Sequence, residues 1–190
     1  MDDSALIVTL QMDAPSAARF TALRRAHFQA ERNWLDAHIT LFHALPGAYA
    51  TDILGDIARA AGRHEAFALR VERVYFLGAG VAYAMSSPEG MALREDLARC
   101  WPTLLGRQDR HWRGPLHVTV QNNVAPAEAK RLQAELERDF VPGDIDAVGL
   151  QVWEYLGGPW RPVATYPFGE RSTSAGRESP SASAGDPPAS

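Results

Sequence analysis

Cysteine is almost absent from this chain of 190 residues, which contains Cys100 and no second thiol. A single cysteine excludes an internal disulfide and a zinc site built from cysteines. No apolar run approaches the roughly 20 residues that a membrane-spanning helix needs, and residues 1–4 lack the basic region of a secretory signal peptide. We therefore expect a cytoplasmic protein in which Cys100 is a small buried hydrophobic residue.

The chain also lacks a net positive charge: 19 Lys and Arg residues, of which only Lys130 is a lysine, stand against 23 Asp and Glu residues, and the formal net charge is −4. Proteins that bind long duplex DNA or RNA are usually basic, because neutralising phosphates dominates that affinity. The composition therefore excludes long duplex nucleic acid and leaves a small nucleotide or a short RNA end as the expected partner. We expect the chain to act on it as a monomer, without contact with a membrane.

Aromatic and β-branched aliphatic residues are missing from Gly169 onward, where the sequence is mostly Ser, Ala, Pro and Gly. Such a segment cannot bury enough apolar surface to offset the entropy lost on ordering. We expect residues 169–190 to be a disordered tail and residues 4–168 to form one domain.

Hydrophobic periodicity and turn residues predict an α+β chain. Alternation predicts strands over 5–11, 38–42, 66–77, 81–86, 117–121, 145–156 and 160–168, and helical spacing predicts helices over 14–31, 50–62, 87–105 and 126–140. The order strand, helix, strand, helix, strand occurs twice, and His38 and His117 at matching places lie 79 residues apart. This offset indicates an internal duplication, with pseudo-repeats at about 4–78 and 79–168 that form two lobes around a groove.

A short motif is shared by the two repeats: residues 38–41 read His-Ile-Thr-Leu and residues 117–120 read His-Val-Thr-Val. Side chains alternate between the faces of a strand, so the histidine and threonine of each motif share one face. Two such strands would place His38, Thr40, His117 and Thr119 around one cleft. One imidazole can accept a proton and the other can donate one near neutral pH. The hydroxyls can donate to phosphoryl oxygens, so we predict these four residues to be catalytic in phosphodiester chemistry.

Four further residues are candidates for substrate binding. Phe42 and Gln121 lie on the histidine faces of their strands, where Phe42 could stack on a base and Gln121 could donate to the substrate. Arg113 precedes the second motif in a loop and could bind a phosphate. Tyr155 alternates with Trp153 on a late strand that could reach the groove. Core packing for Phe42 and a solvated loop for Arg113 are equally good interpretations.

The chain resembles the 2H phosphoesterase superfamily, which includes 2′-5′ RNA ligase-like proteins and RNA 2′,3′-cyclic phosphodiesterases. The resemblance covers residues 4–168 and is carried by the two motifs and by the segments 37–47 and 153–160. It implies a bilobed α+β fold with two antiparallel sheets around a central groove and helices outside. It also implies that His38 and His117 are acid and base, in an order that the sequence leaves open, with Thr40 and Thr119 as hydroxyl partners.

One departure from the RNA-processing members weakens the case for an RNA end as substrate. Those proteins often carry an arginine soon after the second motif, where this chain has Gln121-Asn122-Asn123. The leading hypothesis is a metal-independent phosphodiesterase for a cyclic phosphate or a 2′-5′-linked nucleotide, with ligation as its reverse. The alternatives are a non-catalytic module that binds nucleotides or RNA ends, and a phosphoesterase for a non-nucleotide substrate.

We expect no cofactor and no metal. Each His-x-Thr strand offers one ligand, and no third ligand is evident nearby.

Overall fold

Local signals in the sequence fix where two of the helices begin in the computed structural model, which describes residues 4–171. The carboxylate of Asp13 caps the first helix by accepting from the backbone N–H of Ser16 at 2.9 Å. The Ser87 hydroxyl accepts in the same way from Gly90 at 3.1 Å and caps another. Both helices have a proline in their first turn, where the missing N–H costs nothing.

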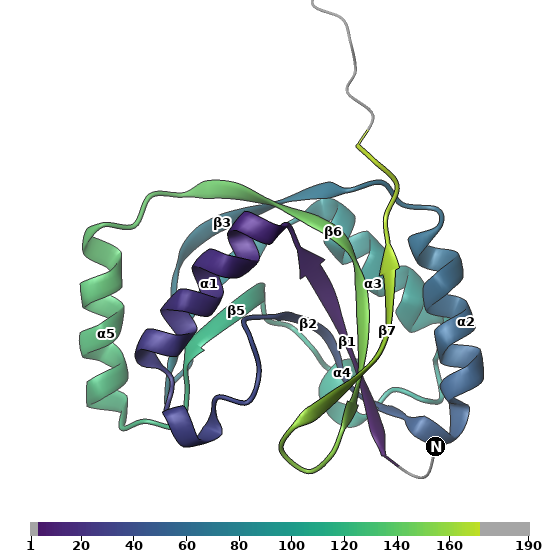
Figure 1. Cartoon of the computed structure of the whole chain (residues 1–190), viewed down its shortest axis with the longest axis horizontal. Coiled ribbons are helices and arrows are strands. Elements are labelled where there is room, and N and C mark those ends of the chain that lie inside the picture. Colours follow the sequence, from purple (N-terminus) through teal and green to yellow (C-terminus); the bar gives the residue numbers. More distant parts are fainter. Residues whose placement is uncertain (1–3, 172–190) are drawn as a thin grey trace, which may run out of the picture.

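Seven strands and five α-helices make up the described part of the chain (Figure 1). Their order is β1 (Ala5–Met12), α1 (Ala14–His27), β2 (Ile39–Pro46), α2 (Ala50–Ala61), β3 (Phe67–Phe76), β4 (Val81–Ser86), α3 (Pro88–Cys100), α4 (Arg107–Arg110), β5 (Leu116–Gln121), α5 (Pro126–Arg138), β6 (Gly143–Tyr155) and β7 (Trp160–Pro167). Short 3₁₀ turns lie at Ala30–Arg32 and Gly47–Tyr49.

The strands join into one antiparallel sheet in the order β1-β2-β5-β4-β3-β6-β7, and an additional pairing of β1 with β6 closes the first six into a ring. Strand β7 is added outside this ring, on β6. The α+β class and the antiparallel pairing are therefore as predicted, and the two expected sheets are joined into a single barrel-like one. Closure removes the exposed edges that two open sheets would present.

The order of strands around the ring has a two-fold symmetry. Exchanging β1 with β4, β2 with β5, and β3 with β6 leaves every pairing of the ring unchanged. The symmetry passes through the β2–β5 contact, which consists of one residue pair, and through the longer β3–β6 contact. Duplication of the chain stays our hypothesis, and this order of pairings supports it.

The first helix ends earlier than the predicted 14–31. The N–H of Phe28 bonds to the Arg24 carbonyl, and Phe28 itself is extended, which closes α1 at His27. The loop that follows folds back because the buried Arg24 side chain binds two of its groups, as described below. The third helix likewise ends at Cys100, before the predicted Leu105.

Cys100 is exposed, so its predicted burial is wrong. It is the last residue of α3, and the neighbouring Trp101 occupies the interior position, 1% exposed.

The described chain continues slightly beyond the predicted domain boundary. Gly169 forms an isolated parallel bridge with Glu65, and the Arg171 guanidinium contacts Asp146 at 2.6 Å. The rest of the predicted tail, residues 172–190, lies outside the described residues. Within residues 4–171, no helix is both long enough and apolar enough to cross a membrane.

Candidate active site

The site is centred where β2 and β5 touch. These strands are antiparallel and pair only at Ile39 and Val118. Both of these side chains are 0% exposed and belong to the hydrophobic core. Because side chains alternate along a strand, the residues on either side of Ile39 and Val118 point away from that core.

Four polar side chains therefore share the face opposite the core. Extending the register by one residue in each direction puts His38 opposite Thr119 and Thr40 opposite His117. The two imidazoles are then diagonal neighbours, for which a spacing of about 7–8 Å is usual. All four residues are half-buried. The structure thus brings together the four residues that the two motifs predicted.

Both imidazoles are held in the same way. The Nδ1 of His38 lies 2.8 Å from the carbonyl of Asp36, and the Nδ1 of His117 lies 3.0 Å from the carbonyl of Pro115. A carbonyl can only accept, so Nδ1 carries the proton in each ring and donates it. The second nitrogen, Nε2, is left as the group that exchanges a proton with a substrate.

The two threonine hydroxyls have no competing partner in the described part of the chain. Among residues 4–171, no hydrogen bond joins the side-chain oxygen of Thr40 or Thr119 to another protein group. Half-buried hydroxyls of this kind remain able to donate to a ligand oxygen.

A buried arginine from the first half of the chain contacts the surroundings of both motifs. Arg24 of α1 is 6% exposed and donates to Asn33 Oδ1 at 2.9 Å, to the Leu35 carbonyl at 3.1 Å and to the Thr119 carbonyl at 2.9 Å. It thereby ties the loop before His38 to the strand of the second motif. The fork of a guanidinium suits such simultaneous bonds, which a lysine amine could not all replace.

A second buried arginine, from the second half of the chain, holds the strand of the first motif. Arg94 of α3 is 7% exposed and donates to the Leu41 carbonyl of β2 at 3.1 Å and to the Asp109 carbonyl of α4 at 2.8 Å. Helix α4 leads into the strand of the second motif. The Asp109 carboxylate also accepts from the ring of His43 at 2.8 Å, which ties α4 to β2. Each half of the chain therefore supplies an arginine that holds the histidine strand of the other half.

His38 is more enclosed than its position on the strand suggests. The indole of Trp160, from β7, lies against its ring with the centroids 4.7 Å apart. Burial of the imidazole, with a smaller contribution from the nearby charges of Arg24 and His117, lowers the pKa of His38 to about 4, against the opposing effect of the bond to Asp36. His38 is consequently neutral at pH 7, with a free Nε2 lone pair.

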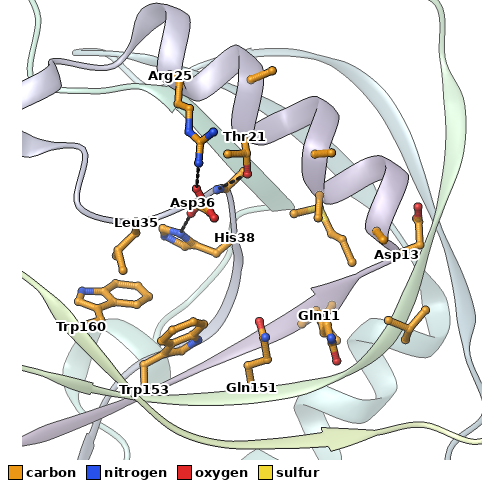
Figure 2. A pocket seen from close by; sticks show the side chains of 18 residues that line it. Gln11, Asp13, Thr21, Arg25, Leu35, Asp36, His38, Gln151, Trp153 and Trp160 are labelled. Carbon is orange, nitrogen blue, oxygen red and sulfur yellow. Dashed lines mark hydrogen bonds and ion pairs between the residues drawn. The ribbon is translucent and has the colours of Figure 1, made fainter.

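A cavity of about 780 Å³ opens beside His38 (Figure 2). It lies over β1 and β6 and is bounded by α1 and by the loop before β2. The Nε1 of Trp153 donates to Thr9 Oγ1 at 3.0 Å, which fixes this indole in the wall. The volume is within the usual range for small-molecule sites.

Phe42 does not reach the site, although the alternation placed it on the His38 face. Its ring is 0% exposed and packs edge-on against Trp101, with the centroids 5.1 Å apart. The cause is a register shift between Thr9 and Val8, which pair with Thr40 and Phe42 respectively. The extra residue in β2 is a bulge that turns both Leu41 and Phe42 inward.

The other three predicted binding residues also lie apart from the cavity lining. Gln121 is 5% exposed, and its amide faces Glu128 of α5 at 3.5 Å. Tyr155 is 43% exposed at the end of β6. Arg113 is exposed in the loop before β5 and donates to the carbonyl of Trp112 at 3.3 Å. Their roles toward a substrate stay predictions.

The cavity adds residues that the motifs did not indicate, chiefly Trp160, Gln11 and Gln151. Alternation with Trp153 on β6 could have indicated Gln151, because both side chains point to the same face. Within the described residues, no group of three or more His, Cys, Asp or Glu side chains is placed to hold a metal ion together.

Comparison with known proteins decides the family. A model of the 2′-5′ RNA ligase superfamily matches residues 12–159, more than three quarters of the chain. This chain belongs to the 2′-5′ RNA ligase superfamily. The resemblance drawn from the two motifs is thus confirmed. No curated protein matches the sequence.

Several solved structures share the fold. TT0787 of Thermus thermophilus superimposes with a TM-score of 0.62 at 15% identity, covering 88% of this chain and 100% of that one. LigT of E. coli complexed with 3′-AMP gives a TM-score of 0.59 at 13% identity, covering 89% of this chain and 100% of that one. LigT complexed with NADP+ gives a TM-score of 0.57 at 16% identity, covering 88% of this chain and 99% of that one. At such identities the likeness concerns the fold alone.

Proposed function

We propose that this member of the 2′-5′ RNA ligase superfamily is a phosphodiesterase that needs no metal ion. Its substrate would be a 2′,3′-cyclic phosphate or a 2′-5′-linked nucleotide or RNA end. The observation that carries the proposal is the pair of imidazoles on one face of β2 and β5, each with Nδ1 bonded to a backbone carbonyl. LigT has been crystallised with 3′-AMP, NADP+ and ATP, which agrees with a small nucleotide as the substrate.

For a cyclic phosphate, water attacks phosphorus as the bond from phosphorus to O3′ breaks. His38 is neutral at pH 7 because burial lowers its pKa to about 4, so its Nε2 accepts the proton that the water loses. His117 donates a proton from Nε2 to O3′, and the product is a 2′-phosphate. Each positioned proton transfer is typically worth about 10²–10⁴ in rate.

Thr40 and Thr119 donate to the non-bridging phosphoryl oxygens, where negative charge concentrates as water attacks. The return of both imidazoles to their starting state needs one proton to pass from His38 to solvent and one from solvent to His117. By the same displacement, a 5′-hydroxyl that attacks phosphorus in place of water would break the bond from phosphorus to O3′ and yield a 2′-5′ linkage. We propose the cytoplasm as the location and the monomer as the active form.

The deciding experiment measures hydrolysis of the four nucleoside 2′,3′-cyclic phosphates and of a short RNA that ends in a cyclic phosphate, all in EDTA. We expect the wild type to release a 2′-phosphate and His117→Ala to release almost none. Loss of wild-type activity in EDTA that zinc or manganese restores would contradict the metal-free mechanism. Nucleotide binding without turnover in either protein would favour the binding module.

A further inference from the structure

The cavity beside His38 is larger than the phosphodiester chemistry requires. It extends from His38 across β1 and β6, one to two strands away from the β2–β5 contact, and ends near the start of α1 (Figure 2). Water and a phosphoryl group would occupy only the end next to His38. The remaining volume is available to the organic part of a substrate.

The charged groups of the cavity wall are already engaged. Both carboxylate oxygens of Asp13 accept backbone N–H bonds at 2.9 Å, from Ser16 and from Asp146. At the opposite end Arg25 and Asp36 form an exposed ion pair at 3.0 Å. Among the described lining residues Arg25 is the one permanent cation. The cavity therefore offers no counterion for a second phosphate and suits an uncharged group.

Two glutamine amides face the cavity floor without protein partners. Gln11 of β1 pairs with Gly149, and Gln151 of β6 pairs with Thr9, so the two glutamines are diagonal neighbours on one face. Both are half-buried, and within residues 4–171 neither side-chain amide has a hydrogen-bond partner. Each amide presents a donor and an acceptor.

Gly149 makes room for the first of these amides. A Cβ at this position would lie 2.8 Å from Gln11 Oε1, so the Gln11 side chain lies directly over the glycine.

Aromatic and small side chains complete the enclosure. The indoles of Trp153 and Trp160 lie side by side with their centroids 6.3 Å apart. The facing side of α1 is lined by alanines, namely Ala14, Ala17, Ala18 and Ala22. Flat indoles opposite short side chains leave a space suited to a flat ring, and base–aromatic stacking is a main source of affinity for nucleotides.

We propose that this cavity is a subsite for the nucleobase of the substrate. Trp153 and Trp160 contact the flat face of the ring, and the amides of Gln11 and Gln151 bind its polar edge. The ligand class is a planar, uncharged heteroaromatic ring attached to the ribose whose phosphate is at His38. This inference rests on the proposed function for its substrate, although free nucleosides test the cavity separately.

The first experiment compares kcat/KM for the four nucleoside 2′,3′-cyclic phosphates with that for methyl riboside 2′,3′-cyclic phosphate, which has the same reacting group and no base. We expect the best nucleoside to be preferred by about tenfold to a hundredfold, the range that stacking of one base supplies. Equal values would overturn the subsite and leave the phosphodiesterase proposal intact.

Variants locate this preference in the cavity. Gln11→Met and Gln151→Met keep the length of the side chain and remove the amide, and each should lower the preference for nucleoside over methyl riboside by about tenfold. Gln133 of α5 is half-buried like the two cavity glutamines and bonds to Glu137, outside the cavity lining. Gln133→Met is therefore the matched control with an unchanged preference. An unchanged preference in both cavity variants would contradict the proposal.

A variant that fills the cavity tests the proposal even if a glutamine variant does not fold. Ala18 is exposed on α1, so Ala18→Trp can project into the cavity without disturbing the core. It should reduce the nucleoside preference in the same way, and retention of the full preference would count against the subsite.

If no cyclic phosphate is hydrolysed at all, the proposed function fails and the subsite is judged by binding. Calorimetric titration with adenosine, guanosine, cytidine and uridine should then show binding to the wild type and at least tenfold weaker binding to Ala18→Trp. Absence of binding at millimolar nucleoside would overturn the inference.

Discussion

The two histidines have equal supports and unequal surroundings. Each ring donates its Nδ1–H to the carbonyl two residues earlier, and each strand is held by a buried arginine from the other half of the chain. Trp160 lies 4.7 Å from the His38 ring. The nearest aromatic contact of His117 among the described residues is Tyr75, at 6.4 Å. The supports follow the two-fold order of the ring, and the surroundings do not.

Strand β7 is the source of the difference, because it is the one strand of the described sheet outside the six-strand ring. It has no counterpart on the side of His117, and it supplies Trp160. A base and an acid must be in different protonation states when they react, and unequal surroundings of the two rings favour such a state. The two-fold order supplies two imidazoles that are held alike, and the added strand packs Trp160 against one of them.

The largest expected effect comes from removing either imidazole. His38→Ala and His117→Ala should each lower kcat by about 10²–10⁴, because each removes one proton transfer. His111→Ala is the matched control, since His111 is exposed and lies only six residues before the second motif. Steady-state kinetics, with circular dichroism to check folding, would test this. A folded His117→Ala protein with wild-type activity would remove the acid–base model.

The threonines should also behave as a pair, with a smaller effect. Thr40→Val and Thr119→Val preserve shape and remove a donor to the phosphoryl oxygens, for which we expect a loss in kcat of about 10² each. Thr103→Val, at an exposed site after α3, should leave kcat unchanged. A loss in only one of the two motif variants would show that the phosphate is held by one strand alone.

The two His-x-Thr motifs, and the strand face that their side chains share, were predictable from the sequence because alternation is a local property of a strand. The same local rule failed one residue further on, at Phe42. The bulge that turns Phe42 inward depends on the register of β2 against β1, and no local pattern in residues 38–46 encodes that register. The helix starts at Asp13 and Ser87 were likewise local and therefore visible in the sequence.

The cavity could not be predicted because it depends on contacts between distant segments. Gln11 and Gln151 become neighbours only when β1 pairs with β6, which lie at opposite ends of the chain. Trp160 reaches His38 only because β7 folds back along β6. The buried arginines were hidden for the same reason, since Arg24 looks like an ordinary exposed residue of a helix until its partner carbonyl on β5 is known.

Substitution of the buried arginines tests whether the halves support each other equally. Arg24→Lys and Arg94→Lys each leave buried carbonyls without a donor, which should cost about 2 kcal/mol of unfolding free energy apiece. Arg25→Lys, on the exposed face of α1, is the control that should change stability little. Urea unfolding measures all three. Destabilisation by only one of the two buried variants would contradict the inference that the two halves of the chain support each other equally.

The smallest effect should come from making the surroundings of the two histidines alike. Trp160→Ala re-exposes His38 and should raise its pKa from about 4 toward its ordinary value. His38 must be neutral to act as base, so activity is present above its pKa and is lost as the pH falls through it. In the wild type, the acid limb of the bell-shaped kcat/KM profile should therefore lie near pH 4, and in Trp160→Ala it should move upward.

Tyr75→Ala is the counterpart next to His117 and should leave this acid limb in place. The profiles are best recorded with the methyl riboside cyclic phosphate, so that loss of a base contact does not mix with the change in pKa. An acid limb that stays near pH 4 in Trp160→Ala would mean that β7 does not set the state of His38. A shift in Tyr75→Ala instead would assign the role of base to His117.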